Sequence, residues 1–423
     1  MTRPTTSVVV VSQGRPNLLR RCLVGISQLW FPEFEVIVVA DQAGLDAIKS
    51  LPFHGSLKTA LFEDHNISAA RNIGLSLAAG KVTAFIDDDA VPEPGWLFHL
   101  TDVFADSAVV ASGGYVLGRN GISIQWKPAR VSNLNYERDI DADGDQPLLA
   151  TYTMGTAVKT HGTNCAFRTD ALRQAGGFDP AFRFFLDETD LNMRLAKHGV
   201  TAIVPLAQVH HGYAASDKRK QNRCPVSLFD VGRSTAIFLR KYAPTELHKQ
   251  RLDDLVSEHT SMLNQHLNTG GCEPHEVGPI LATLWEGIRS GKDEDLSTLE
   301  PISGNPPNFR MFDHSHTGNL EILYGRRAKN SKLRAKAIEI AAKGHVTSVF
   351  SLGFTALFHK VTFCEDGYWL QTGGIWGRSN RHERLIHATT LRKRVATETI
   401  RIMKVRYPWV SGNVANDDVQ KID

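Results

Sequence analysis

The first half of the chain alternates short apolar runs with segments in which apolar residues recur every three or four positions. Apolar runs of this length predict strands, and the longer spacing predicts helices between them. The expected strands lie at residues 7–11, 35–40, 57–62, 82–86 and 108–116, and the expected helices at 19–29, 66–79, 169–175 and 188–198. Strands that alternate with helices favour an α/β fold, with a mainly parallel sheet flanked by helices.

The pattern changes in the second half of the chain. Residues 125–161 are polar and irregular and predict a loop region on the substrate side, and residues 202–204 predict a short strand before His210 and His211. The spacing then predicts helices at 226–242, 245–267, 276–289, 332–343 and 392–404, strands at 346–350 and 359–363, and a Pro/Gly-rich linker at 301–307. The aromatic and glycine-rich segment 368–377 favours the core of a small β unit over a binding surface.

The length of the chain bounds its organisation. At 423 residues it exceeds what one hydrophobic core usually holds, so more than one domain is expected. We expect an α/β domain at 1–222, a helical segment at 223–300 and a small C-terminal α/β accessory domain at 301–423. The net charge of +3 is too small to indicate nucleic acid as a partner.

Cysteine usage and hydropathy indicate the compartment. The five cysteines are far apart, with no Cys-x-x-Cys pair, which is typical of reduced thiols in a cytosolic protein. No apolar stretch is long enough to span a bilayer, and the N-terminus has no signal-peptide pattern. We therefore expect a cytoplasmic protein. Peripheral contact at the inner face of the membrane is an alternative, because Lys218, Arg219, Lys220 and Arg223 carry the charge to hold anionic headgroups.

Three consecutive carboxylates, Asp87, Asp88 and Asp89, follow the apolar run at 82–86. Acids this close repel one another, and burying even one costs several kcal/mol without a positive partner. Oxygen ligands of this kind suit Mg²⁺ or Mn²⁺, which leave positions open for phosphate oxygens. The alternative is a polar turn whose aspartates cap the next helix. Gln13 and Asp41 also follow predicted strands, and ligands of open α/β sheets bind at this edge.

Two common phosphate-binding motifs are excluded. Residues 74–81 resemble a P-loop, but five residues separate the two glycines, Val82 stands in place of Ser or Thr, and the segment runs from helix to strand. No Gly-x-Gly-x-x-Gly follows the first predicted strand. P-loop and dinucleotide chemistry are therefore not expected.

Several short motifs in a fixed order are more specific. Asn66, Ala70-Arg71-Asn72-x-Gly74, Phe85 to Asp89 and Pro94-x-Trp96-Leu97 come first, and Gly162 to Arg168, Gly176 to Asp179 and Asp187 to Leu195 follow. Together they resemble the family-2 glycosyltransferases with the GT-A fold. The resemblance spans about residues 6 to 216, roughly half the chain.

The resemblance implies a metal-dependent, inverting transfer of a sugar from a nucleoside diphosphate, linked to UDP, GDP or dTDP, to a hydroxyl of a glycan or glycolipid acceptor. It also implies a role in bacterial surface polysaccharide synthesis. The expected nucleotide contacts are Gln13, Asp41, Arg71, Asp87 and Asp88. The expected ligands of Mn²⁺ or Mg²⁺ are Asp89, Asp87 and one of His210 and His211. Trp96 and Asp187 are the expected acceptor contacts.

The reaction also needs a base. An acceptor hydroxyl needs a carboxylate to take its proton as it attacks. The family usually has Glu-Asp at this place, whereas this chain has Asp187-Glu188. Glu188 therefore occupies the position of the base, and either carboxylate has the reach to serve. The alternative is a structural role, in which the two acids begin a helix and are stabilised by the positive end of its dipole.

Two other functions fit part of the pattern. A nucleotidyltransferase shares the sheet and the metal-held phosphates, but typically carries a Gly-rich, basic loop after the first strand, of which residues 12–15 are a poor version. A non-catalytic sugar-binding or protein-binding module that kept the fold is the other alternative.

Overall fold

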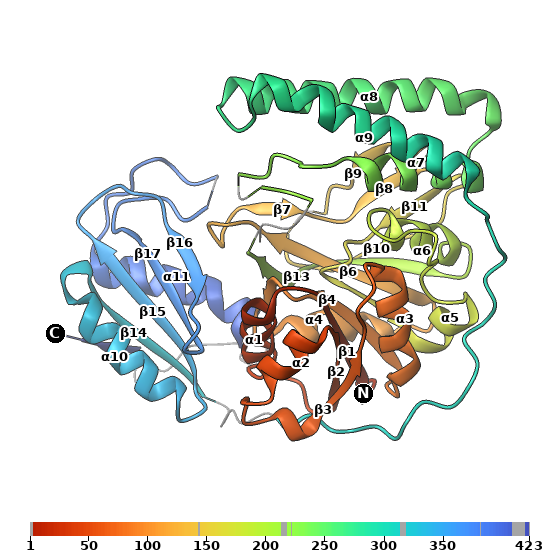
Figure 1. The fold of residues 1–423 in the computed structure, drawn as a ribbon. Helices are drawn as coiled ribbons and strands as arrows, with labels where there is room; N and C mark the ends of the chain where they lie inside the picture. The colour runs from red at the N-terminus through yellow and green to blue at the C-terminus, as the bar shows by residue number, and fades with distance from the viewer. Residues whose placement is uncertain are drawn as a thin grey trace.

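The computed structural model of the protein describes residues 3–142, 144–212, 218–220, 222–313, 319–380, 382–407 and 419–422. Its strands form a large mixed sheet, a small three-stranded sheet and a separate five-stranded sheet near the C-terminus (Figure 1). Apolar residues pack on both faces of the large sheet, under helices. The predicted α/β class is therefore confirmed.

Parallel strands form the N-terminal half of the large sheet. They are, in spatial order, β3 (Leu57–Leu61), β2 (Phe34–Ala40), β1 (Thr6–Ser12) and β4 (Val82–Asp87). Because successive residues point to opposite faces, Val8 and Val10 pack on one side of the sheet and Val9 and Val11 on the other. The helices on the two faces are α1 (Pro16–Ile26) and α4 (Trp96–Asp102) on the first, and α3 (Ile67–Leu77), α5 (Thr169–Gln174) and α6 (Asp187–Leu195) on the second.

Beyond β4 the large sheet becomes mixed. β12 (Cys165–Arg168) pairs antiparallel with β4 and with β6 (Val109–Leu117), and β13 (Val200–His211) runs parallel to β6. Cys165 at the start of β12 pairs with Phe85 near the end of β4. This register brings the segment before Cys165 to the same edge of the sheet as the acid triplet.

The prediction of an irregular loop at 125–161 was wrong in part. Here β8 (Ala129–Ser132), β9 (Glu137–Asp139) and β11 (Thr156–Lys159) form the small sheet, while β7 (Ile124–Trp126) and β10 (Leu148–Ala150) join the large one. Each strand has only three or four residues, with two buried positions in β8 and three consecutive ones in β11. Segments this short are too brief to show an alternating pattern in the sequence.

The strand expected at 202–204 is much longer than predicted. β13 has 12 residues, and both histidines lie inside it rather than after it. The register against β6 shifts between Val204 and Gln208, which marks a bulge around Pro205. The proline and the bulge interrupt the apolar alternation, and so they hid the second half of the strand.

The helices expected after residue 226 are present. They are α7 (Phe229–Tyr242), α8 (Thr245–Asn268) and α9 (Pro274–Asp293), with α8 and α9 at the top of Figure 1. A capping box between Glu273 and Glu276 starts α9. Ile237 and Phe238 of α7 pack in one cluster with Phe182 and Leu186, so this helix rests on the segment that leads into α6.

The C-terminal sheet has the order β16 (Lys360–Phe363), β17 (Tyr368–Gly374), β15 (Val346–Gly353), β14 (Leu320–Arg326) and β18 (Val419–Lys421). Only β16 runs antiparallel to its neighbour. Helices α10 (Asn330–Ala341) and α11 (Leu391–Arg406) pack against it. Tyr368 and Trp369 are buried, as expected for the core of a small β unit.

The C-terminal part of the chain contacts the N-terminal part directly. The indole of Trp369 donates to the Gln28 side chain at 3.3 Å, and the Gly95 amide donates to the Val405 carbonyl at 2.7 Å. The expected division into 1–222, 223–300 and 301–423 stays a prediction. Among the described residues, every helix is too short or too polar to cross a membrane.

Candidate active site

The acid triplet lies at the carboxyl end of β4, beside the turn that follows β1. Asp88 is almost fully buried, and the Ser12 hydroxyl donates to it at 2.6 Å. The Arg15 guanidinium lies 2.7 Å from Asp88 and 3.6 Å from Asp89. Burial raises the pKa of Asp88 to about 7, although Arg15 and Ser12 oppose this shift. Arg15 thus offsets only part of the negative charge of Asp88 and Asp89.

Arg15 is a site residue that the sequence reading did not assign. It stands just before α1, and its side chain is about one-third exposed. The available signal was its place in the turn after the first strand, at the same sheet edge as the acids.

Asp41 and Gln13 also lie at this edge, as their places after strands predicted. Asp41 caps α2 (Gln42–Ile48) by accepting from the Gly44 amide at 2.7 Å, and its other oxygen accepts from the Gly14 amide at 2.5 Å. Gly14 has a φ of +67°, which glycine adopts without strain. Gln13 donates to the Glu63 carbonyl at 3.0 Å. The loops after β1, β2 and β3 are therefore joined to one another.

Arg71 connects the acid triplet with the start of α6. It lies on α3, is buried, and pairs with Asp87 at 3.1 Å and with Asp187 at closer range. Burial opposes its charge, but Asp187 and Asp87 together raise the pKa of Arg71. Gly162, just before β12, lies against this guanidinium, and a Cβ atom there would overlap it. The glycine of the Gly162-Thr163-Asn164 motif therefore leaves room for the arginine.

Asp187 and Glu188 begin α6, after two residues with unusual backbone. Phe185 and Leu186 have φ of +73° and +64°, a conformation that costs a bulky residue about 1–3 kcal/mol. Asp187 is buried, and burial raises its pKa to about 7 while Arg71 opposes the shift. Glu188 is only half-buried. The strained turn therefore presents one acid to Arg71 and leaves the next one open to solvent.

The two histidines of β13 have different partners. His211 Nε2 lies 3.3 Å from an Asp89 oxygen, and its ring packs 5.1 Å from the ring of Trp126. His210 Nε2 lies 2.7 Å from Glu93, which in turn pairs with Arg406. Neighbouring residues of a strand point to opposite faces, so only His211 stands beside the acid triplet.

The donor atoms present fit a divalent cation with few protein ligands. Asp89 Oδ1 and His211 Nε2 are 3.3 Å apart, near the separation of about 3 Å between adjacent ligands of an octahedral ion. Carboxylate and imidazole together suit Mn²⁺. No group of three or more His, Cys, Asp or Glu side chains in the described part of the chain is arranged to hold a metal. Most ligands of such an ion would therefore come from water or a bound substrate.

Trp96 does not face the site. It is fully buried and packs in the core between the sheet and α4, where its indole donates to Asn164 at 2.7 Å. The Asn164 amide donates in turn to the carbonyls of Tyr115 and Ala207. The structure thus gives Trp96 a core position in place of the expected wall of an acceptor site, and Asn164 a role in joining β6, β12 and β13.

Comparison with known proteins agrees with this geometry. Residues 7–176 match the family model of glycosyl transferase family 2. The glucosyl-dolichyl phosphate glucuronosyltransferase of Haloferax volcanii is 30% identical over 28% of this chain and 36% of its own length. The pre-mycofactocin glycosyltransferase of Mycobacterium tuberculosis is 27% identical over 49% of this chain and 42% of its own length. The chain thus spans less than half the length of these curated relatives.

A solved structure of S. aureus TarS 1-349 in complex with UDP-GlcNAc is 20% identical, covers 68% of this chain and 81% of that chain, and has a TM-score of 0.45. The family match covers β1 to α5 and contains the acid triplet, Arg71 and Gly162. The family match and the named relatives together support a family-2 glycosyltransferase.

Proposed function

We propose that this protein transfers a sugar from a nucleoside diphosphate to a hydroxyl of a glycan or glycolipid, with inversion and with the help of Mn²⁺ or Mg²⁺. The single observation that carries the proposal is the placement of Arg71 between Asp87 and Asp187. It brings an acidic strand end, suited to a metal-bound diphosphate, next to an acid pair suited to activate an acceptor. The curated relatives, both named as glycosyltransferases, support the same class.

The donor half of the proposed site lies at the ends of β1, β2 and β4. Asp89 and His211 would hold the cation, and Asp87 would contact it or a water bound to it. The chemistry that a divalent cation supplies in such a site is neutralisation of the charge that grows on the diphosphate leaving group. Asp41, Gln13 and Asp88 are the proposed nucleotide contacts, and of these Asp88 acts through Arg15, to which it is paired.

The acceptor half is formed by the start of α6. We assign the role of base to Glu188, because Asp187 is buried and held by Arg71 whereas Glu188 reaches solvent. Asp187 would then position Arg71 and contact the acceptor sugar. One base and no protein nucleophile suffice for a single displacement, which inverts the anomeric carbon.

The proposed setting is surface polysaccharide synthesis in a bacterium, with the protein in the cytoplasm or at the inner face of the membrane. It rests on the resemblance to the family. Lys218 pairs with Asp230 and Lys220 with Glu276, so part of the basic cluster is already neutralised within the chain. The pairing reduces the attraction of this cluster for anionic lipid headgroups.

The proposal is tested by incubating the purified protein with UDP-, GDP- and dTDP-sugars in the presence of Mn²⁺, Mg²⁺ or a chelator. We expect release of the nucleoside diphosphate with one donor and loss of that release with chelator. Glu188→Gln is expected to lower turnover by about a hundredfold or more with nucleotide binding retained. Glu286→Gln, an exposed change on α9, is the matched control.

Three outcomes would contradict the proposal. Release of pyrophosphate instead of a nucleoside diphosphate would indicate a nucleotidyltransferase. Nucleotide-sugar binding without any turnover would indicate a binding module. Absence of both binding and turnover with every donor would remove the enzyme hypothesis altogether.

A further inference from the structure

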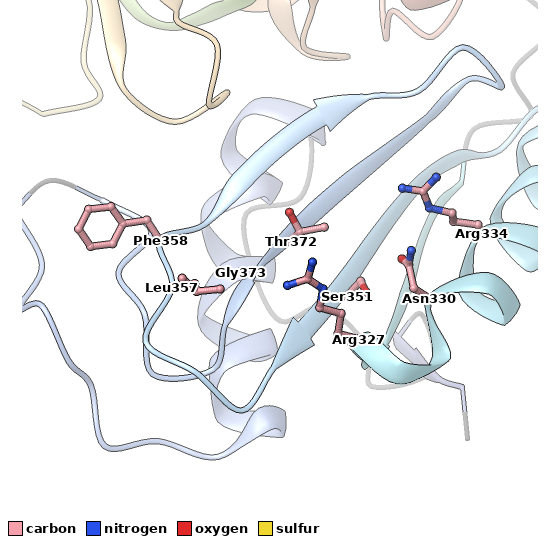
Figure 2. A pocket seen from close by; sticks show the side chains of 8 residues that line it. All are labelled: Arg327, Asn330, Arg334, Ser351, Leu357, Phe358, Thr372 and Gly373. Atoms are coloured by element: carbon pink, nitrogen blue, oxygen red, sulfur yellow. The ribbon is translucent and has the colours of Figure 1, made fainter.

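A second cavity lies in the C-terminal sheet, away from the proposed active site. It has a volume of about 220 Å³, and Figure 2 shows the eight residues that line it. They are Arg327, Asn330, Arg334, Ser351, Leu357, Phe358, Thr372 and Gly373. These residues come from the carboxyl ends of the parallel strands β14, β15 and β17 and from the start of α10. Ligands of open parallel sheets bind at this edge.

One side of the cavity is rich in hydrogen-bond donors. Arg327 and Arg334 both line it, and neither forms a salt bridge within the described part of the chain. The first turn of α10 has no acidic residue to repel an anion. No acidic side chain is found among the described residues that line the cavity. The lining is therefore suited to a negatively charged group.

Ser351 is the observation that points most directly to a ligand. Its side chain is fully buried on β15, yet its hydroxyl has no hydrogen-bond partner among the described residues. A buried hydroxyl left unpaired destabilises the fold, and proteins rarely retain one without a use for it. The Asn330 side-chain oxygen, at the start of α10, is buried and unpaired in the same part of the molecule. Ser351 and Asn330 line the same cavity as Arg327 (Figure 2).

The other side of the cavity is apolar and exposed. Leu357 and Phe358 lie in the loop between β15 and β16, and their exposed fractions are 55% and 57%. The loop is not held loosely, because the Gly374 amide donates to the Leu357 carbonyl at 3.0 Å and the Trp376 amide to the Thr355 carbonyl at 3.2 Å. A fixed backbone thus presents apolar side chains to solvent at the mouth of a basic pocket.

We propose that this cavity binds a phosphate group attached to an apolar body, a site separate from sugar transfer. Two guanidinium groups and the hydroxyls of Ser351 and Thr372 offer donors from several directions, which suits the several oxygens of a phosphate better than a planar carboxylate. Leu357 and Phe358 would contact the apolar part of the same molecule. A soluble phosphorylated compound and a phospholipid headgroup share this chemistry.

The first test measures phosphate binding by the full chain. Inorganic phosphate is expected to raise the thermal midpoint more than acetate or chloride at equal ionic strength, because it binds the folded state. The double variant Arg327→Gln/Arg334→Gln is expected to bind phosphate about tenfold or more weakly. Ser351→Ala is expected to reduce the rise in thermal midpoint that phosphate causes. It should not destabilise the free protein, because the Ser351 hydroxyl has no partner there.

The matched control is Arg326→Gln, which removes the same charge from the adjacent position. Arg326 does not line the cavity, since its guanidinium lies over the ring of Phe354 at 4.7 Å. The Arg326→Gln variant is expected to retain the rise in thermal midpoint that phosphate causes. Glu188→Gln is expected to retain it too, which separates this site from the proposed active site.

A second arm identifies the source of the phosphate. Sedimentation with vesicles containing phosphatidylglycerol is expected for a lipid ligand, and it should fall in the double arginine variant and in Phe358→Ala. Phosphate binding without vesicle binding assigns the site to a soluble phosphorylated compound, and either result supports the proposal. An equal gain with acetate, or wild-type behaviour of the double variant in both arms, overturns it.

Discussion

Arg406 of α11 and Glu93, which follows β5 (Ala90–Pro92), form a buried ion pair with two hydrogen bonds, at 2.7 and 3.1 Å. They are 313 positions apart in the chain, and Glu93 also binds His210. The last helix of the C-terminal part is thereby connected to the segment that follows the acid triplet. Since both side chains are about 3% exposed, loss of either partner leaves a buried charge.

We expect Arg406→Met to lower the free energy of unfolding by about 3–5 kcal/mol, because Glu93 then keeps its charge in the interior without its main partner. Urea denaturation of the purified protein measures this change. Arg392→Met, an exposed substitution on the same helix, serves as control and is expected to change stability by less than about 0.5 kcal/mol. A similar small loss for both variants would show that the ion pair contributes little.

The same pair predicts a pH dependence. Burial opposes the charge of Glu93, but Arg406 and His210 lower its pKa to about 2. A carboxyl whose folded-state pKa is depressed stabilises the protein above its unfolded pKa, and this contribution is lost as the pH falls through the folded value. We therefore expect about 3 kcal/mol to disappear between about pH 4.5 and pH 2. The measurement compares the slopes of unfolding free energy against pH for wild type and Glu93→Gln, and equal slopes would contradict it.

Gly162→Ala is expected to lower sugar transfer by about a hundredfold, because the added methyl group would displace the Arg71 guanidinium from its two carboxylates. Initial rates with the preferred donor test this. Gly278→Ala is the matched change, since a Cβ there meets nothing within 4 Å, and on α9 it should slightly stabilise the protein. Unchanged rates in Gly162→Ala would mean that the position of Arg71 does not matter for transfer.

Substitutions of the two histidines of β13 are expected to have different effects on the dependence of turnover on Mn²⁺. His211→Ala removes a proposed ligand and should raise the Mn²⁺ concentration for half-maximal donor turnover by about tenfold or more. His210→Ala should leave this concentration unchanged and instead lower thermal stability, because it breaks the contact with Glu93. His198→Ala, an exposed change, controls for general loss of imidazole. A metal effect confined to His210→Ala would reverse the assignment.

The sequence could predict those parts of the site that depend on local pattern. Gln13, Asp41 and the acid triplet each follow an apolar run, and parallel strands bring such positions to one edge whatever the details of packing. The contact between Arg71 and Asp187 joins residues 116 positions apart and depends on the register of β12 against β4. No periodicity within either segment contains that information.

Other features could not be predicted from the sequence, for local reasons. The left-handed backbone of Phe185 and Leu186 carries no glycine to mark it, because the surrounding packing imposes the strain. Trp96 was expected near an acceptor, yet aromatic residues at helix starts serve cores and sites equally well. Residues 368–377 were expected in the core of a small β unit, but the bounds of β17 were not predicted, since its two glycines at 373 and 374 interrupt the run of strand-forming residues.

The bulge in β13 determines which histidine faces the acids. A strand has a two-residue repeat, so the irregularity between Val204 and Gln208 sets the phase of every side chain beyond it. Deleting one residue there would move His211 to the place beside Glu93 that His210 now holds, and would put Gly212 at the place beside Asp89. Insertions and deletions at this point of the chain are therefore far more damaging than their size suggests.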